Sequence, residues 1–202
     1  MPIRETGCKF LVCSYHADMP QAESTVTSPL ARSVADGSLQ GHGSDVGQTG
    51  SSTAADVVRG VSRLFARNDI WCTPEMMLRN GRRADLMGID ARGQVILVEI
   101  KVSRADLLGD GKWTDYLDYC DRFYWALPPS LDRAPLETEA FLPESCGVIV
   151  ADGYDAEILR PAPLRQMAAA RRKVEVERLA RTALRRLVVG SDPETQKWDR
   201  EG

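Results

Sequence analysis

The feature that most constrains this fold is an apolar run ending in charged residues. Val95–Val98 leads directly into Glu99-Ile100-Lys101, and a second run of strand character, Arg83–Ile89, precedes it. The two runs are separated by Asp90-Ala91-Arg92-Gly93, a composition typical of a tight turn. Together they predict a β-hairpin whose second strand carries an acid and a base at its end.

The register of this hairpin decides which side chains meet. Alternation along the second strand puts Glu99 and Lys101 on one face, because successive side chains point to opposite sides of a sheet. If the connection is a three-residue loop with Gly93 in the left-handed conformation, Asp90 pairs with Gln94 and Asp85 falls opposite Glu99. Both carboxylates and the lysine then share one face.

Such a group has a chemical use. Two neighbouring carboxylates repel each other unless a cation lies between them. Mg²⁺, or Mn²⁺ in its place, takes oxygen ligands, so we expect Asp85, Glu99 and the carbonyl of Ile100 to bind it. Lys101 would then assist a water that attacks a phosphodiester. The simpler alternative is a surface ion pair between Glu99 and Lys101 at a strand end.

Asp85 with Glu99-Ile100-Lys101 resembles the PD-(D/E)XK nuclease signature, with Ala84 in place of its proline. The wider sequence is similar to the MmcB-like family of bacterial DNA repair proteins. This likeness covers about residues 54–189 and implies a restriction-endonuclease-like fold and a role in DNA repair. The residues that carry it are Arg82–Asp85, Glu99–Asp106, Asp110, Lys112-Trp113, Asp121–Tyr124 and Ala169–Arg172.

Length and composition predict one α/β domain with tails. The chain has 202 residues, 43% apolar and 27% charged, which is typical of a globular protein. Residues 1–52 are rich in Ser, Gly, Thr and Ala, and we expect a disordered tail; Met19 inside it is an alternative start. The nuclease-like domain is predicted at 53–190, and a flexible tail at 191–202.

Periodicity predicts a mixed sheet, built on an antiparallel meander and flanked by helices. A helix capped by Thr53 opens the domain, a second helix spans Lys112–Cys120, and a long helix spans Pro163 to about Val189. The expected strands are Thr73–Leu78, Arg83–Ile89, Gln94–Val102, Arg122–Leu127, Gly147–Ala151 and Glu157–Leu159.

Three further residues are candidates for the site. Lys112 and Tyr116 are four apart, so on an α-helix they would share a face and reach a scissile phosphate. Relatives in the superfamily often place an assisting polar residue on this helix. Glu75 is a candidate extra metal ligand. A two-residue turn at Asn80-Gly81 would place it opposite Leu86 on the wrong face, whereas a three-residue turn would correct this.

Affinity for DNA must come from local basic clusters, because the formal net charge is −3. The long C-terminal helix has a strongly basic face, for which a solvated surface is the plain alternative. We expect Asp121-Arg122 to form a structural ion pair and Trp113 to pack. The residues predicted to contact nucleic acid are Arg83, Ser103, Arg104, Arg171, Arg172 and Arg178.

Other classes of function are disfavoured. Both histidines, His16 and His42, lie in the predicted tail, which leaves no partner for a Ser or Cys nucleophile. Five separated cysteines favour a reducing cytoplasm, and no apolar run has the length of a membrane span. Expected partners are DNA, other repair proteins and a second copy of the chain. The alternatives to a DNA nuclease are a non-catalytic module that binds DNA or a partner, and a protein-interaction scaffold.

Overall fold

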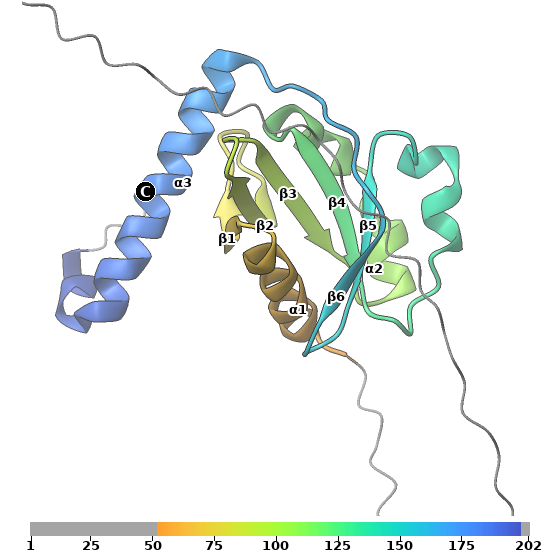
Figure 1. Cartoon of the computed structure of the whole chain (residues 1–202), viewed down its shortest axis with the longest axis horizontal. Helices are drawn as coiled ribbons and strands as arrows, with labels where there is room; N and C mark the ends of the chain where they lie inside the picture. The colour runs from red at the N-terminus through yellow and green to blue at the C-terminus, as the bar shows by residue number, and fades with distance from the viewer. Residues whose placement is uncertain (1–51, 199–202) are drawn as a thin grey trace, which may run out of the picture. The chain divides into compact units, whose positions relative to one another are not determined.

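The structure, a computed structural model, describes residues 52–198, which form an α/β fold around one six-stranded sheet (Figure 1). The strands lie side by side in the order in which they follow each other in the chain. The predicted tail at residues 1–52, which includes Cys8, Cys13 and His16, lies outside the described residues, apart from Ser52. The strands are β1 (Ile70–Met77), β2 (Arg83–Asp90), β3 (Val95–Ile100), β4 (Arg122–Leu127), β5 (Gly147–Ala151) and β6 (Ala156–Arg160).

The predicted mixed sheet on an antiparallel meander is confirmed. β1, β2 and β3 pair antiparallel in sequence order. β4 then pairs parallel to β3, and β5 pairs parallel to β4, whereas β6 returns antiparallel to β5. The parallel pairs need crossover connections, and these contain the helices between β3 and β4 and between β4 and β5. β3 is buried along its whole length, as expected for a central strand.

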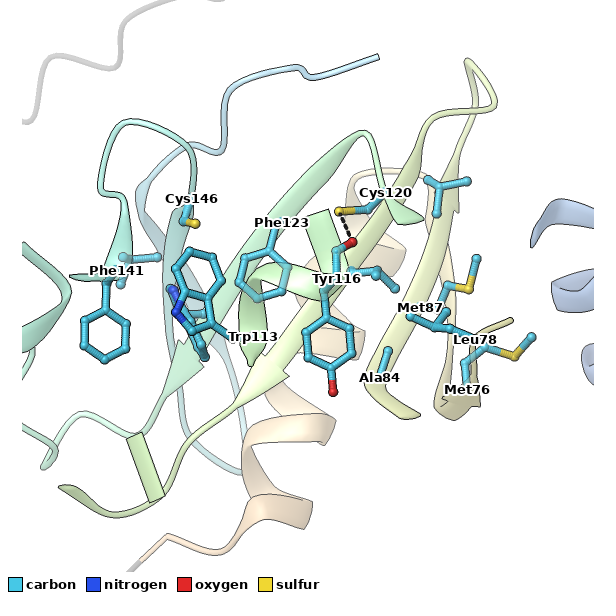
Figure 2. Close-up of a cluster of buried hydrophobic side chains, with 14 of the residues drawn as sticks. Met76, Leu78, Ala84, Met87, Trp113, Tyr116, Cys120, Phe123, Phe141 and Cys146 are labelled. Carbon is cyan, nitrogen blue, oxygen red and sulfur yellow. Dashed lines mark hydrogen bonds between the residues drawn. The ribbon is translucent and has the colours of Figure 1, made fainter. Parts of the chain in front are cut away.

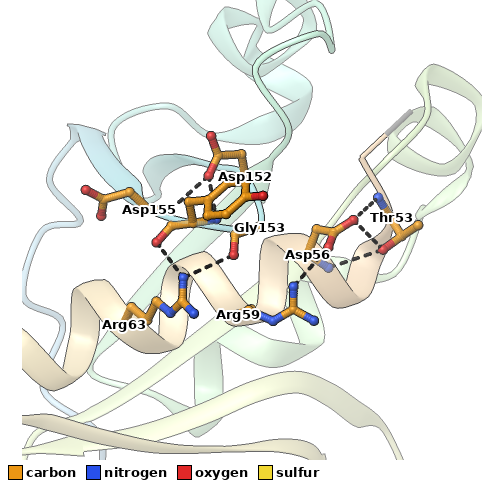
Figure 3. A network of polar contacts seen from close by, with 8 residues as sticks. Thr53, Asp56, Arg59, Arg63, Asp152, Gly153 and Asp155 are labelled. Carbon is orange, nitrogen blue, oxygen red and sulfur yellow. Dashed lines mark hydrogen bonds and ion pairs between the residues drawn. The ribbon is translucent and has the colours of Figure 1, made fainter. Parts of the chain in front are cut away.

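Helix α1 (Ala54–Arg67) opens the domain and begins at a capping box, as Thr53 predicted. The amide of Asp56 donates to the Thr53 hydroxyl at 3.2 Å, and the Thr53 amide donates to the Asp56 carboxylate at 3.0 Å. Arg63 donates to the carbonyls of Gly153 and Tyr154 in the β5–β6 turn, at 3.2 and 2.9 Å (Figure 3). These bonds attach α1 to the β5–β6 turn.

The two faces of the sheet carry separate cores. One core contains Val57, Val61 and Phe65 of α1 with residues of β2 to β5. The opposite core is rich in aromatic rings, with Trp113 5.2 Å from Trp125 and 5.6 Å from Phe123 between ring centroids (Figure 2). Trp113 therefore packs, as predicted, and its offset and edge contacts suit aromatic rings.

The connection between β3 and β4 differs from the single helix predicted at Lys112–Cys120. It has a short α2 (Arg104–Gly109) and then a 3₁₀ segment, η1 (Trp113–Tyr119). Gly109 ends α2, and Gly111 lies between the two segments. Glycine is a poor helix former, which explains the break. Further 3₁₀ turns, η2 (Ala134–Glu137) and η3 (Glu139–Phe141), lie between β4 and β5.

The long C-terminal helix is present but starts later than predicted. Helix α3 spans Ala169–Ser191, whereas residues 163–168 are not helical. The amides of Arg165 and Met167 instead donate to the backbone and side chain of Asp121, at 2.8 and 2.9 Å. These two bonds hold the segment in an extended form.

The second half of α3 packs less than its apolar residues suggested. Leu179 is buried, but Leu184 and Leu187 are 61% and 65% exposed. The predicted domain boundary at residue 190 falls within the helix, and a 3₁₀ turn, η4 (Pro193–Trp198), follows it. In the described part of the chain no helix has both the length and the apolar character needed to cross a bilayer.

Gly60 provides a test of how α1 packs. A Cβ at this position would lie 2.3 Å from the Asp152 carbonyl oxygen and 2.5 Å from that of Asp155. Alanine favours helix by about 1 kcal/mol over glycine, but overpacking costs about 1–3 kcal/mol, so the clash should prevail. We expect Gly60→Ala to lower the free energy of unfolding in chemical denaturation.

Gly109→Ala is the matched control, because a Cβ there meets no atom within 4 Å. It should leave stability unchanged or raise it slightly. Equal stability of the two variants would show that α1 does not rest on the β5–β6 turn through Gly60.

Candidate active site

The β2–β3 hairpin has the predicted register. Gly93 has a φ of 76°, and its amide donates to the Asp90 carbonyl at 2.9 Å. The Asp90 amide donates to the Gln94 carbonyl at 3.1 Å, which closes the three-residue loop. Only a residue that tolerates positive φ suits this loop position, and glycine does so without a Cβ clash.

Asp85 and Glu99 meet where the β2–β3 ladder ends. Regular pairing stops at Leu86 opposite Val98. Beyond it the Ile100 amide donates to the Asp85 carboxylate at 2.7 Å, and the Asp85 amide faces a Glu99 carboxylate oxygen at 3.4 Å. The side chain of each acid thus lies beside the backbone of the other strand. The predicted pair of acids is brought together.

Lys101 lies beside this pair on the same face. Its ammonium nitrogen is 3.8 Å from a Glu99 carboxylate oxygen, 3.7 Å from Asp106 and 3.0 Å from Asp110. It also lies 5.8 Å from the centre of the Trp125 ring. Lys101 is 7% exposed and Glu99 is 4% exposed. The two residues are therefore buried and do not form a surface ion pair.

Burial dominates the protonation of the acids. It raises the pKa of Glu99 to about 8, with the charge of Asp85 acting in the same direction and that of Lys101 opposing it. Burial also raises the pKa of Asp85, against the hydrogen bond from Ile100. For Lys101, burial opposes the charged form, but the bond and charge of Asp110 and the charge of Glu99 prevail and raise its pKa.

The two assisting candidates, Lys112 and Tyr116, do not share a face. Lys112 precedes the 3₁₀ segment, in which residues three apart align rather than residues four apart. Lys112 is exposed, whereas Tyr116 is buried and donates its hydroxyl to the Arg83 carbonyl at 3.1 Å. Burial and then the charges of Glu99 and Asp110 raise the pKa of Tyr116, so it stays a neutral phenol beside the acids.

The loop between β1 and β2 has the three-residue length that would correct the register of Glu75, but the Glu75 side chain does not point toward the acids. The Leu78 amide donates to the Arg82 carbonyl at 2.7 Å, so the loop is Arg79-Asn80-Gly81. Glu75 then lies between the pairs Pro74–Leu86 and Met76–Ala84. Its φ of 50° breaks the alternation of β1, and its side chain is 63% exposed and pairs with Arg83 at 3.5 Å. The metal role of Glu75 has no support from this geometry.

Three of the predicted nucleic-acid residues lie near the acids. Ser103 caps α2, because its hydroxyl accepts from the Asp106 amide at 3.1 Å. Arg83 and Arg104 are exposed and pair with Glu75 and with Asp132. Ser103 thus has a structural use, and the two arginines have charged ends in solvent.

The three arginines of α3 differ from one another. Arg172 binds the buried Asp121 through two bonds, one of them 2.6 Å, and also donates to the Gly93 carbonyl at 2.9 Å. Arg171 pairs with Asp118 at 3.1 Å, and Arg178 donates to the Met77 carbonyl at 3.0 Å. The ion pair of Asp121 is therefore with Arg172, not with the neighbouring Arg122 as predicted. Arg122 donates instead to Gln94 and to the Ala162 carbonyl.

The sequence does not single out Asp110 as a site residue, although it makes the shortest contact to the ammonium of Lys101. An acid soon after the end of β3 is the sequence signal for Asp110, but a cap or loop residue gives the same pattern.

A cavity of about 610 Å³ lies apart from the acids, at the start of α3. It is lined by Arg79, Tyr119, Arg171 and Glu175 among others, so of the predicted residues Arg171 reaches it.

The donor set suits a hard divalent cation. The buried carboxylate of Glu99, the partly buried carboxylate of Asp85 and a peptide carbonyl are oxygen donors, the type that Mg²⁺ takes, and Mg²⁺ keeps several waters. Among residues 52–198 no three His, Cys, Asp or Glu side chains form a metal-binding group, so further ligands would be carbonyls or water. Raised pKa values mark two acids that gain from a neutralising charge.

The fold and the group of two acids and a lysine define an α/β protein with a mixed six-stranded sheet and a cluster of charged side chains where β2 and β3 meet. The model of a family described as "DNA repair protein MmcB-like" matches residues 42–194, and the chain belongs to this MmcB-like family. No curated protein matches the chain.

Solved structures similar to the chain include one from Silicibacter pomeroyi and one from Pyrococcus abyssi. A protein of unknown function from Silicibacter pomeroyi is 40% identical, with a TM-score of 0.62 over 68% of this chain and 90% of that one. A repair endonuclease from Pyrococcus abyssi is 20% identical, with a TM-score of 0.30 over 46% of this chain and 45% of its own.

The pKa of Glu99 predicts a pH dependence of stability. The unfolded chain loses this proton near pH 4.5, whereas the folded chain keeps it to about pH 8. The stabilisation from Glu99 is therefore complete below pH 4.5 and is lost as the pH rises through 8. Glu99→Gln should remove this loss, so that in EDTA the variant gains on the wild type by a few kcal/mol between pH 5 and 9.

Denaturant unfolding at several pH values measures this gain. Glu157→Gln, on the exposed edge strand β6, is the matched control and should follow the wild type. A constant difference between Glu99→Gln and the wild type across this pH range would contradict the raised pKa.

Proposed function

We propose that this protein is a metal-dependent nuclease that hydrolyses DNA phosphodiester bonds in repair. The observation that carries the proposal is the junction of β2 and β3, where Asp85 and Glu99 lie against each other's backbone and Lys101 lies 3.8 Å from Glu99. Membership of the MmcB-like DNA repair family supports the setting in repair.

The acids would bind the cation. Asp85 and Glu99 offer carboxylate oxygens, and the carbonyl of Ile100 is the third donor. Mg²⁺ or Mn²⁺, when bound, would lower the pKa of a water and stabilise charge that develops on the phosphate oxygens. The acids Asp85, Glu99 and Asp110 outnumber the ammonium of Lys101, so a bound divalent cation would balance their charge once Glu99 gives up its proton.

Lys101 would act as an ammonium rather than as a base. Contacts to three carboxylates hold its charge, and one of them is within hydrogen-bond distance. An ammonium has three donors, so two remain for a water and for a phosphate oxygen. It can orient the water and stabilise negative charge, while the proton of the water must leave to another acceptor.

A second candidate function is a module that binds DNA or a repair partner without cutting it. The burial of Glu99 and Lys101 favours it, because a scissile phosphate must reach both groups. Internal bonds also occupy the Asp85 carboxylate and the hydroxyl of Tyr116. Under this alternative the acids and the lysine hold the end of the hairpin.

Nuclease assays separate the two functions. We expect the wild type to cut single-stranded, duplex or branched DNA with Mg²⁺ or Mn²⁺ and not in EDTA. Asp85→Asn and Glu99→Gln should each reduce cutting by at least about 100-fold, as for loss of one key charge in a preorganised site. Asn and Gln are chosen because they keep a side-chain acceptor for the Ile100 and Asp85 amides.

Asp118→Asn is the matched control, an exposed acid paired with Arg171, and should retain activity. Cutting that survives in both site variants would reveal a contaminant. No cutting by the wild type on any of these substrates, together with unchanged DNA binding by the variants, would favour the non-catalytic module.

The basic helix predicts binding that depends on salt. Arg171 and Arg178 expose about two fifths of their side chains, whereas Arg172 is committed to Asp121. Removing two phosphate contacts should reduce the slope of log Kd against log salt by about 2. We expect this of Arg171→Gln/Arg178→Gln in fluorescence anisotropy with labelled DNA in EDTA.

Arg59→Gln/Arg63→Gln makes the same change of charge on α1, which packs on the opposite face of the sheet. Its salt slope should equal that of the wild type. If both double variants change the slope alike, net charge rather than α3 drives the binding.

A further inference from the structure

Asp110 makes the shortest contact to the ammonium of Lys101. One of its carboxylate oxygens accepts from the ammonium at 3.0 Å, whereas the oxygens of Asp106 and Glu99 are 3.7 and 3.8 Å away. Among the contacts of the Lys101 ammonium with acids of residues 52–198, this is the one within hydrogen-bond distance. A hydrogen bond between two charged groups is short and strong, so it determines the direction of the side chain.

Asp110 is also better shielded than the other acid that follows the strand. Its side chain is 16% exposed, against 45% for Asp106. Water screens an exposed pair, so the Asp106 contact contributes little, whereas the Asp110 contact is screened much less. The charge that organises Lys101 therefore comes from Asp110.

The chain holds Asp110 in place through α2. Ser103 caps the helix, Leu107 is fully buried, and Asp110 is the residue at which the helix ends. Lys101 is tied at the other end, because its amide donates to the Ala126 carbonyl of β4 at 3.0 Å. The Lys101–Asp110 bond thus joins the end of the central strand to the end of α2.

We propose that Asp110 is the positioning residue for Lys101, an inference that rests on the proposed nuclease function. It holds the ammonium in one orientation next to Glu99 and uses one of its three donors. The two other donors then have a defined direction toward water and phosphate. Asp110 itself touches neither.

Two measurements test this role, and the first does not need activity. In ¹⁵N-detected spectra of the lysine side chains, a buried, bonded ammonium exchanges its protons slowly and gives a visible signal. We expect this signal for Lys101 in the wild type and in Asp106→Asn, and expect its loss in Asp110→Ala. Lys101→Arg identifies the signal.

The second measurement is steady-state cutting of DNA. Asp110→Ala should lower kcat by about 10- to 100-fold with little change in KM or in DNA affinity, because orientation and not binding is lost. Asp110→Asn keeps an acceptor oxygen and should recover part of kcat. Asp106→Asn, with the same loss of charge on the same helix, should stay within about threefold of the wild type.

The outcomes separate the two proposals. A Lys101 signal that persists in Asp110→Ala, or equal losses of kcat in Asp106→Asn and Asp110→Asn, would overturn the role of Asp110. If the Lys101 signal is lost in Asp110→Ala but the wild type cuts no DNA, Asp110 remains the residue that positions Lys101, and the proposed nuclease function is refuted. Thermal unfolding of each variant shows whether it folds, and Asp110→Asn serves if Asp110→Ala does not.

Discussion

The rest of the structure depends on one buried carboxylate, that of Asp121. It accepts hydrogen bonds from the amides of Val95 and Met167, at 2.7 and 2.9 Å, and from the guanidinium of Arg172. Its own amide donates to the Val95 carbonyl at 2.7 Å. β3, β4, the extended segment and α3 therefore meet at one side chain. Removal of one partner leaves a buried charge unpaired, which costs about 3–5 kcal/mol. The main role of Arg172 is therefore to stabilise the fold.

The candidate site uses buried charge in the opposite way. At Asp121 the bonds outweigh burial and lower the pKa, whereas at Glu99 burial outweighs its neighbours and raises the pKa to about 8. One acid is satisfied by the protein, and the other is left with less compensation than its burial requires. This contrast between Glu99 in the sheet and Asp121 at its edge distinguishes a structural carboxylate from one suited to bind a ligand.

The sequence predicted the parts of the fold that local chemistry determines. The β2–β3 register followed from a loop that ends in Gly93, and the start of α1 followed from Thr53 and Asp56, because each depends on residues close in the chain. The extended segment before α3 and the pair of Asp121 with Arg172 depend on residues about fifty apart, which no local pattern encodes. The direction of Glu75 was missed for a different reason, a positive φ at a non-glycine residue.

The acids and the lysine come from a single hairpin, and this has a consequence for the order of folding. Asp85 and Glu99 are separated by a short loop, so bringing them together loses little chain entropy. The contact of Arg172 with Asp121 spans 51 residues and closes a far longer loop. We expect the hairpin to pair early and the docking of α3 to come late, as contact separation slows folding. On a ribosome, the hairpin that carries the candidate site would thus pair before the helix that docks on it has been synthesised.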